Sequence, residues 1–232
     1  MRPIGVLGGT CWEETANYVR YLDEAVRTCL GEEHSVRCLV LTTDAAGSLP
    51  PDGAKCAAER LAGDAVRLCA TGAALVVFAS VPVHACFDEV EAAVGVPVPH
   101  VADAAARAAR DRGMGTVALL GTAETMVEAF FRDRLARHGL EVLVPEPVDR
   151  EVVDALAQPR RRRERAPEEE QRQQIRAVIA RLADAGAHAV VVAAAELEPL
   201  VPAVGGALPV LPARALHARA AVALAIEDED QH

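Results

Sequence analysis

The sequence predicts an α/β protein with two pseudo-symmetric lobes, each a mainly parallel sheet flanked by helices. Two observations lead to this fold class. Short, continuously apolar runs alternate with longer amphipathic stretches along the 232 residues. Unbroken apolar strands are typical of parallel sheets that helices cover on both faces. In addition, an early pair of apolar runs resembles a later pair, which favours two similar lobes.

Seven apolar runs are the expected strands. In chain order they are IGVLGG, RCLVLTT, ALVVFAS, TVALLGT, LEVLVPE, AVVVAAA and LPVLPA, which begin at residues 4, 37, 74, 116, 140, 189 and 208. The stretches between them are amphipathic, so we expect helices at 13–30, 56–71, 87–93, 103–112, 125–138, 150–157, 168–185 and 217–226.

The internal similarity sets the expected domain boundaries. GVLGGT followed by ALVVFAS resembles VALLGT followed by AVVVAAA, because each pair is a strand, a glycine turn, a helix and a second strand that ends in small residues. We therefore expect one lobe from residues 1–100 plus 206–232 and the other from 101–205. Ligands of such sheets bind at the carboxyl ends of strands, so these four strands should converge on a cleft between the lobes. The alternative is a single sheet with a coincidental similarity.

Composition limits the classes of partner. Hydrophobic residues make up 51% of the chain and aromatic residues only 3%, so the core must be aliphatic. The net charge of -10 argues against nucleic acid or an anionic membrane as the main partner. No apolar run reaches the roughly 18–20 residues that cross a bilayer. The opening MRPIGVLGGT is too short an apolar stretch for a secretion signal, so a cytoplasmic location is expected.

Neither the cysteines nor the arginine run predicts a special site. The six cysteines show no CxxC pairing and no metal-type spacing, so we expect free, buried thiols and no metal. The arginines at 160–163 precede Glu164 and the glutamates at 168–170, whose charges largely cancel theirs. This pattern indicates an exposed loop before a salt-bridged helix. GVLGGT lacks the GxGxxG spacing of a dinucleotide site, and no pattern indicates a cofactor.

Several segments together resemble one family. The stretch IGVLGGTCWEETANYVRYLDEAV is similar to the opening of the aspartate/glutamate racemase superfamily, and in particular to its aspartate racemase branch. VALLGTAETMVEAFFRDRLARHGLEVLVPE resembles the opening of that family's second lobe. GAHAVVVAAAEL and LPVLPARALHARAAV align with later family segments, so the resemblance covers essentially the whole chain. It implies the racemase fold, chemistry without a cofactor, and a homodimer.

The resemblance also implies which chemistry is missing. In the family, two cysteines, one per lobe, flank the substrate's α-carbon; one thiolate removes a proton and the opposite thiol returns one. The first cysteine maps to Ala79 in the segment ASVPVH at 79–84, and the second maps to Ala194. A methyl group cannot transfer a proton, so the ancestral reaction is expected to be lost. Val81 and Pro82 replace residues that would bind the substrate, and Pro212-Ala213 replaces a usual Asp-Thr pair.

Three surviving side chains are the candidate acid/base groups. Glu196 follows the run VVVAAA, where partial desolvation would raise its pKa, although it could equally cap the next helix. His84 has two interpretations. It is a general acid or base near neutral pH, or its ring bonds to the backbone at the start of a helix. His217 is expected at the start of the last helix. Its side chain either makes a polar contact there or pairs with Glu196 across the cleft.

The remaining candidates would bind the substrate. Thr10 and Glu13 fit a capping box, and Cys11 is either a small buried thiol or a displaced reactive one at a helix N-terminus. Thr122 and Thr125 would hold a carboxylate at a helix N-terminus, or would only cap it. A widened, largely apolar floor would be formed by Ala79, Ser80, Val81 and Ala194.

These residues support one leading hypothesis and two alternatives. The leading hypothesis is a repurposed, cofactor-independent enzyme that isomerises, eliminates from or cyclises a small organic acid or biosynthetic intermediate, as in specialised metabolism. The first alternative is a non-catalytic ligand-binding or regulatory protein. The second keeps racemase activity through Cys11 or Cys86. In each case the expected ligand is small and acidic.

Overall fold

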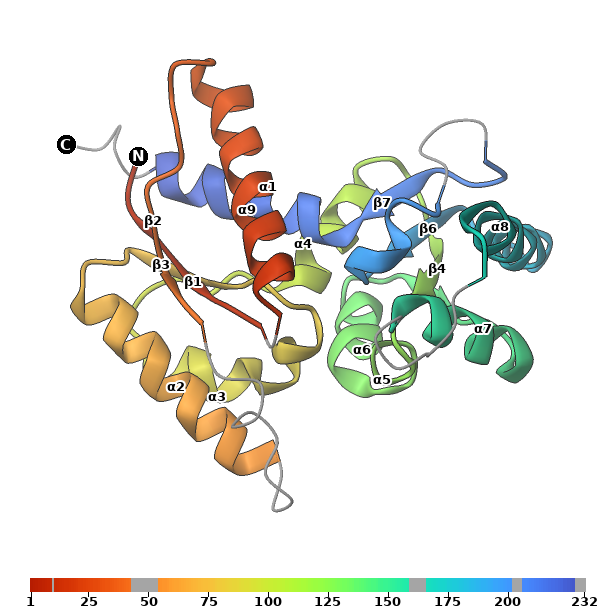
Figure 1. The fold of residues 1–232 in the computed structure, drawn as a ribbon, viewed down its shortest axis with the longest axis horizontal. Coiled ribbons are helices and arrows are strands. Elements are labelled where there is room, and N and C mark those ends of the chain that lie inside the picture. Colours follow the sequence, from red (N-terminus) through yellow and green to blue (C-terminus); the bar gives the residue numbers. More distant parts are fainter. Residues whose placement is uncertain (10, 43–53, 159–165, 202–205, 228–232) are drawn as a thin grey trace. The chain divides into compact units, whose positions relative to one another are not determined.

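The chain forms two compact units, each with its own parallel sheet (Figure 1). The structure is a computed structural model that describes residues 1–9, 11–42, 54–158, 166–201 and 206–227. The first unit comprises Met1–Val101 with His217–His232, and the second comprises Ala102–Leu216. No helix within the described ranges is both long enough and apolar enough to cross a bilayer.

The first unit is a three-stranded parallel sheet between two helical layers. Its strands are β1 (Ile4–Leu7), β2 (Cys38–Leu41) and β3 (Leu75–Phe78), in the order β2-β1-β3. Helices α1 (Trp12–Leu30) and α9 (Ala213–Glu227) cover one face, and α2 (Ala54–Ala70) and α3 (Phe87–Ala93) cover the other. A short 3-10 turn, η2 (Pro82–Cys86), joins β3 to α3.

Alternating side chains of β1 and β3 reach the two helical layers. Ile4, Val6 and Val77 pack with α1 and α9, whereas Leu7 and Phe78 pack on the side of α2 and α3. These five residues are at most 1% exposed. Burial of both faces explains why each strand is an unbroken apolar run in the sequence.

The second unit has four parallel strands. They are β4 (Thr116–Leu120), β5 (Glu141–Leu143), β6 (Ala189–Val192) and β7 (Val210–Pro212), in the order β5-β4-β6-β7. Five helices in the described part of the chain belong mainly to this unit: α4 (Val101–Arg110), α5 (Ala123–Val127), α6 (Ala129–Arg137), α7 (Pro147–Ala157) and α8 (Glu168–Asp184). A 3-10 turn, η4 (Ala195–Leu197), follows β6.

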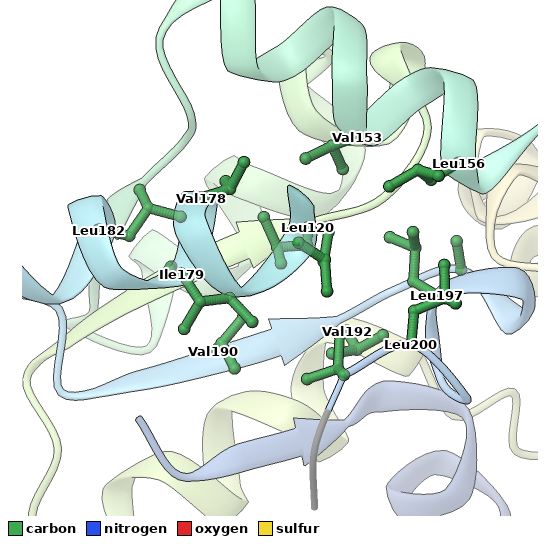
Figure 2. Packing of buried hydrophobic residues seen from close by; sticks show 14 of the residues in the cluster. Leu120, Val153, Leu156, Val178, Ile179, Leu182, Val190, Val192, Leu197 and Leu200 are labelled. Atoms are coloured by element: carbon green, nitrogen blue, oxygen red, sulfur yellow. The ribbon is translucent and has the colours of Figure 1, made fainter. Parts of the chain in front are cut away.

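One aliphatic cluster holds α7, α8 and the turn after β6 against this sheet. Figure 2 shows side chains from the two helices meeting side chains from the strands and from the segment around η4. The labelled members of the cluster are Leu120, Val153, Leu156, Val178, Ile179, Leu182, Val190, Val192, Leu197 and Leu200. The segment that follows β6 is therefore anchored in the core of its unit.

The strand predictions are confirmed, and the internal similarity corresponds to real structure. All seven apolar runs contain a strand, and the order β2-β1-β3 in the first unit matches β5-β4-β6 in the second. The expected helix at 125–138 is instead two helices, because Glu128 has an extended backbone (φ -72°, ψ 154°) between α5 and α6.

The second domain boundary differs from the expected one. Residues 206–216 were expected in the first lobe, but β7 pairs with β6 in parallel and draws this segment into the second unit. The last helix begins at Ala213 instead of at 217, directly after β7. Thr10 and the arginines at 160–163, on which the expected capping box and exposed loop depend, lie outside the described residues.

Candidate functional site

Backbone contacts bring the ends of β1 and β3 together in the first unit. The Ala79 amide donates to the Leu7 carbonyl at 2.9 Å, which continues the ladder one residue beyond β3. A Cβ added to Gly9 would lie 2.7 Å from the Cβ of Ser80, closer than real side chains approach. The glycine is therefore required by the close approach of the Ser80 segment. Ser80 is 8% exposed, and its backbone makes a hydrogen bond to the side chain of His84.

The strand register identifies Ser80 as the counterpart of Ala194. Leu7 pairs with Phe78 in the first sheet, and Leu120 pairs with Val192 in the second. The Ala79 amide donates to the carbonyl of Leu7, and the Ala193 amide donates to that of Leu120 at 2.8 Å. Ala79 therefore corresponds to Ala193, and the next residue, Ser80, corresponds to Ala194.

This register differs by one residue from the pairing that the sequence suggested. We expected Ala79 and Ala194 to be the two equivalent positions, but they lie on opposite sides of their sheets. Ala79 packs with α1 and α9, whereas Ala194 packs on the α7 and α8 side, which corresponds to the α2 and α3 side of the first unit. Neither Ser80 nor Ala194 carries sulfur, so the absence of a cysteine holds with either pairing.

His84 is a buried, neutral imidazole. Its ring is 2% exposed, and Nδ1 lies 3.2 Å from the Val81 carbonyl. Since a carbonyl only accepts, Nδ1 carries the proton and Nε2 presents a lone pair. Nε2 is buried and lacks a partner among the described residues. Burial, and then the neighbouring His100 and His217, hold the pKa of His84 well below its usual range. This geometry matches the backbone-bonded alternative and leaves Nε2 of His84 as a hydrogen-bond acceptor.

His217 is held at both ring nitrogens. Its Nε2 lies 2.9 Å from the Pro99 carbonyl, and its Nδ1 lies 2.7 Å from the Tyr18 hydroxyl. Because Nε2 must donate to the carbonyl, the neutral ring accepts from Tyr18 at Nδ1. An acid/base role, or a bond to Glu196, would require one of these hydrogen bonds to open.

Replacing Tyr18 by Phe should lower the free energy of unfolding by about 1–3 kcal/mol. The change leaves a buried imidazole nitrogen without its donor, and an unsatisfied buried acceptor has a cost of this order. Urea unfolding followed by circular dichroism measures the effect. Trp12→Phe is the control, since Trp12 is 71% exposed at the start of the same helix. Equal losses in the two variants would contradict the proposed hydrogen bond.

Glu196 is a carboxylate near the end of β6 in the second unit. It lies in η4, two residues after Ala194, and is half-buried. Its side chain makes no hydrogen bond or ion pair to the rest of the described chain. The cap of η4 is Ala194, which has no side chain for this purpose. The carboxylate is therefore not committed to a structural contact.

Thr122 and Thr125, near the end of β4, form hydrogen bonds with each other. Thr122 caps α5, with Oγ1 accepting from the Thr125 amide at 3.3 Å and lying 3.0 Å from the Thr125 hydroxyl. Their residue exposures are 9% and 0%. The capping alternative therefore describes the observed contacts, while a bound anion stays a prediction.

The described cysteines give no sign of a stable thiolate. Cys11 is half-exposed, and its Sγ lies 2.8 Å from a carboxylate oxygen of Glu13, an arrangement that favours the protonated thiol as donor. The pKa of Cys86 is raised by burial and by the charge of Glu89. Within the described ranges, no three His, Cys, Asp or Glu side chains are grouped to hold a metal.

Sequence reasoning missed His100. It is 2% exposed, and its ring centroid lies 4.8 Å from that of His84 and 4.9 Å from that of Phe87. His217 completes the group, with its centroid 5.3 Å from that of His84. Three buried histidines thus meet from segments far apart in the chain, and no spacing in the sequence signals this.

Comparison with known proteins identifies the family. The model of the Asp/Glu/hydantoin racemase family matches residues 7–221. This chain belongs to that family. A crystal structure from Yersinia pestis, designated a candidate Asp/Glu racemase, is 32% identical with a TM-score of 0.89, over 97% of this chain and 100% of that one. An aspartate racemase homologue from Pyrococcus horikoshii is 26% identical with a TM-score of 0.86, over 97% and 99%.

More distant structures share the fold of this racemase-family chain. Unliganded arylmalonate decarboxylase is 15% identical with a TM-score of 0.56, over 97% of this chain and 93% of that one. The fold predicted from the racemase resemblance is therefore confirmed. The family thus includes relatives named as racemases, and the fold extends to a protein named as a decarboxylase.

Proposed function

We propose that this chain is a cofactor-independent enzyme that performs a non-thiol acid/base reaction on a small organic acid or biosynthetic intermediate. The reaction would be an isomerisation, an elimination or a cyclisation. The observation that carries the proposal is that the racemase fold is kept while the two equivalent strand-end positions hold Ser80 and Ala194. A methyl group transfers no proton, and a serine hydroxyl ionises far less readily than a thiol. A pair of opposed thiols is therefore not available at these positions.

Glu196 is the group that we assign to proton transfer. It follows Ala194 in the chain, is half-buried, and has no structural partner among the described residues. A carboxylate in such a place is free to take and return a proton during turnover. In the first unit, the Nε2 lone pair of His84 supplies a hydrogen-bond acceptor. Both ring nitrogens of His217 are already hydrogen-bonded, so His217 would position its neighbours and would not itself transfer a proton.

The substrate of this proposed enzyme is an acid that carries more carbon than aspartate does. Val81 in the first unit and Ala194 in the second are buried and apolar, which suits an apolar substituent better than an ammonium group, whereas Ala79 packs into the core beside α1 and α9. Thr122 and Thr125 would hold the acidic group only if their mutual hydrogen bond rearranged. A homodimer and a cytoplasmic location belong to the same proposal.

Without a thiol pair, the protein should not exchange the α-proton of L- or D-aspartate or glutamate. Proton NMR in D₂O, with purified protein and each amino acid, measures the exchange directly. The rate is expected to equal that of a protein-free sample, whereas general acid/base catalysis typically contributes about 10²–10⁴-fold. Phenylmalonate, a probe suggested by the named decarboxylase, is tested in parallel for exchange or loss of a carboxyl group.

Alkylation of the thiols distinguishes two outcomes of that assay, one against the non-thiol proposal and one for it. Exchange of aspartate that disappears after alkylation with iodoacetamide would mean that Cys11, Cys86 or another thiol works in the protein. Turnover of any acid that survives alkylation would support the non-thiol proposal.

A non-catalytic binding protein is the second candidate. The observation that favours it is that three of the expected functional side chains, Thr122, Thr125 and His217, are already bonded within the protein. This candidate predicts that an acid raises the thermal midpoint without being changed. A ligand at 100 times its Kd stabilises the native state by about 2.7 kcal/mol.

A further inference from the structure

The chain passes between the two units twice, and buried histidines lie at both passages. The first passage is at Val101–Ala102, immediately after His100, and the second is at Leu216–His217. The Nε2 of His217 donates to the carbonyl of Pro99 at 2.9 Å. One hydrogen bond within the first unit therefore ties the segment before the first passage to the segment after the second.

His84 packs against the histidines of both passages. Its ring meets those of His100 and His217 edge-on, with centroids 4.8 and 5.3 Å away and interplanar angles of 71° and 70°. All three residues are at most 2% exposed. We call His84, His100 and His217 the histidine cluster. Phe78 of β3 meets the ring of His84 at 4.8 Å, which adds an apolar wall.

We propose that the histidine cluster is an acid-released clamp that holds the two chain passages together while its imidazoles are neutral. The proposal does not depend on the proposed enzymatic function. It follows from the position of the cluster, the hydrogen bond between the passages, and the contact of three basic rings in a buried place.

Among the described residues, only the backbone of Ser80 and Val81 favours a positive charge on His84, and burial outweighs their effect. The titratable groups that face it are His100, from the segment before α4, and His217, from α9; Tyr18 of α1 lies behind His217. The wall from β3 is Phe78, which is uncharged. No carboxylate is among the causes that act on the His84 ring. A proton taken up here would meet two basic neighbours in a water-poor environment.

The sign of the pH effect follows from the lowered pKa of His84. An unfolded histidine binds a proton at about pH 6.5, whereas folded His84 resists it, so acid favours the open state. The contribution to stability is complete above that value and is lost as the pH falls toward the folded pKa. One such histidine changes the opening equilibrium by up to about tenfold per pH unit within this window.

Hydrogen exchange of the full chain, followed by mass spectrometry, tests the clamp. Peptides covering 97–103 and 213–220 should lose protection by about tenfold or more between about pH 7.5 and pH 5.5, after correction for intrinsic exchange. Peptides from α8 should change less. Equal protection of the two passages at both pH values would overturn the proposal.

Two variants separate the cluster from other histidines. His84→Phe keeps a planar ring and removes the proton site, so the pH-dependent loss at the passages should become much smaller. His34→Gln, at an exposed position in the first unit, should leave the loss unchanged. A full pH-dependent loss in His84→Phe would overturn the proposal.

An NMR titration of the unaltered protein keeps the test decisive if His84→Phe does not fold. His84 should titrate over the same pH range as the loss of protection, below the ordinary range of a histidine. Titration of the cluster without any change at the two passages would overturn the proposal.

Discussion

Glu196→Gln should lose about 10²–10⁴-fold in turnover of an acid that the unaltered protein converts, the range that a general acid or base contributes. The amide is nearly isosteric with the carboxylate but cannot accept and return a proton. Since Glu196 has no structural partner among the described residues, the variant should fold normally. Steady-state kinetics and thermal unfolding on the same preparation measure the two properties.

The matched control is Glu170→Gln. Glu170 is an exposed carboxylate in the first turn of α8, in the same unit, so its loss changes net charge equally. We expect its turnover to be unchanged and its stability to change by less than about 1 kcal/mol, the typical value of a charge at a helix N-terminus. Equal activity of the two variants would remove Glu196 from the mechanism and would favour His84 as the proton acceptor.

The strands were predictable because their physical requirement is local. A strand covered by helices on both faces needs apolar residues at every position, and this requirement is visible in the sequence itself. The seven strands, including the short β7, satisfy it except at Thr116 and Glu141, the first residues of β4 and β5. The assignment of β7 to the second unit was not predictable in the same way, because it depends on pairing with β6, which is a contact between distant segments.

The one-residue difference between Ala79 and Ser80 has a related cause. Resemblance aligns whole segments well, but successive residues of a strand point to opposite faces. A shift of one residue therefore moves a candidate from the α1 and α9 side of the sheet to the α2 and α3 side. Only the register of β1 with β3, compared with that of β4 with β6, fixes which residue corresponds to Ala194.

The histidine cluster lies beyond sequence reasoning for a stronger reason. Its members are at positions 84, 100 and 217, in three different segments, and each alone is an ordinary residue near a helix start. His84 and His217 were candidates for acid/base work, yet their nitrogens are engaged with backbone or with Tyr18, apart from the Nε2 of His84. The sequence shows which residues are histidines, but it does not show which hydrogen bonds their ring nitrogens make.

Leu197→Ala is the substitution from which we expect the largest loss of stability, about 2–5 kcal/mol, the usual range for truncating a buried leucine. Leu197 is fully buried in the second unit's core cluster, and its carbonyl accepts from the amides of Leu200 and Val201 at 3.0 Å (Figure 2). Urea unfolding followed by far-ultraviolet circular dichroism measures the loss. Val148→Ala, at a position 76% exposed on α7, should stay within about 0.5 kcal/mol of the unaltered protein.

This variant also tests how the core supports the proposed chemistry. Leu197 follows Glu196 directly, so the side chain that anchors η4 fixes the backbone from which the carboxylate projects. We expect Leu197→Ala to lose turnover as well as stability, whereas Glu196→Gln loses turnover alone. A Leu197→Ala protein that is as stable as Val148→Ala would show that the turn is not held by the core, and the position of Glu196 would then have no structural basis.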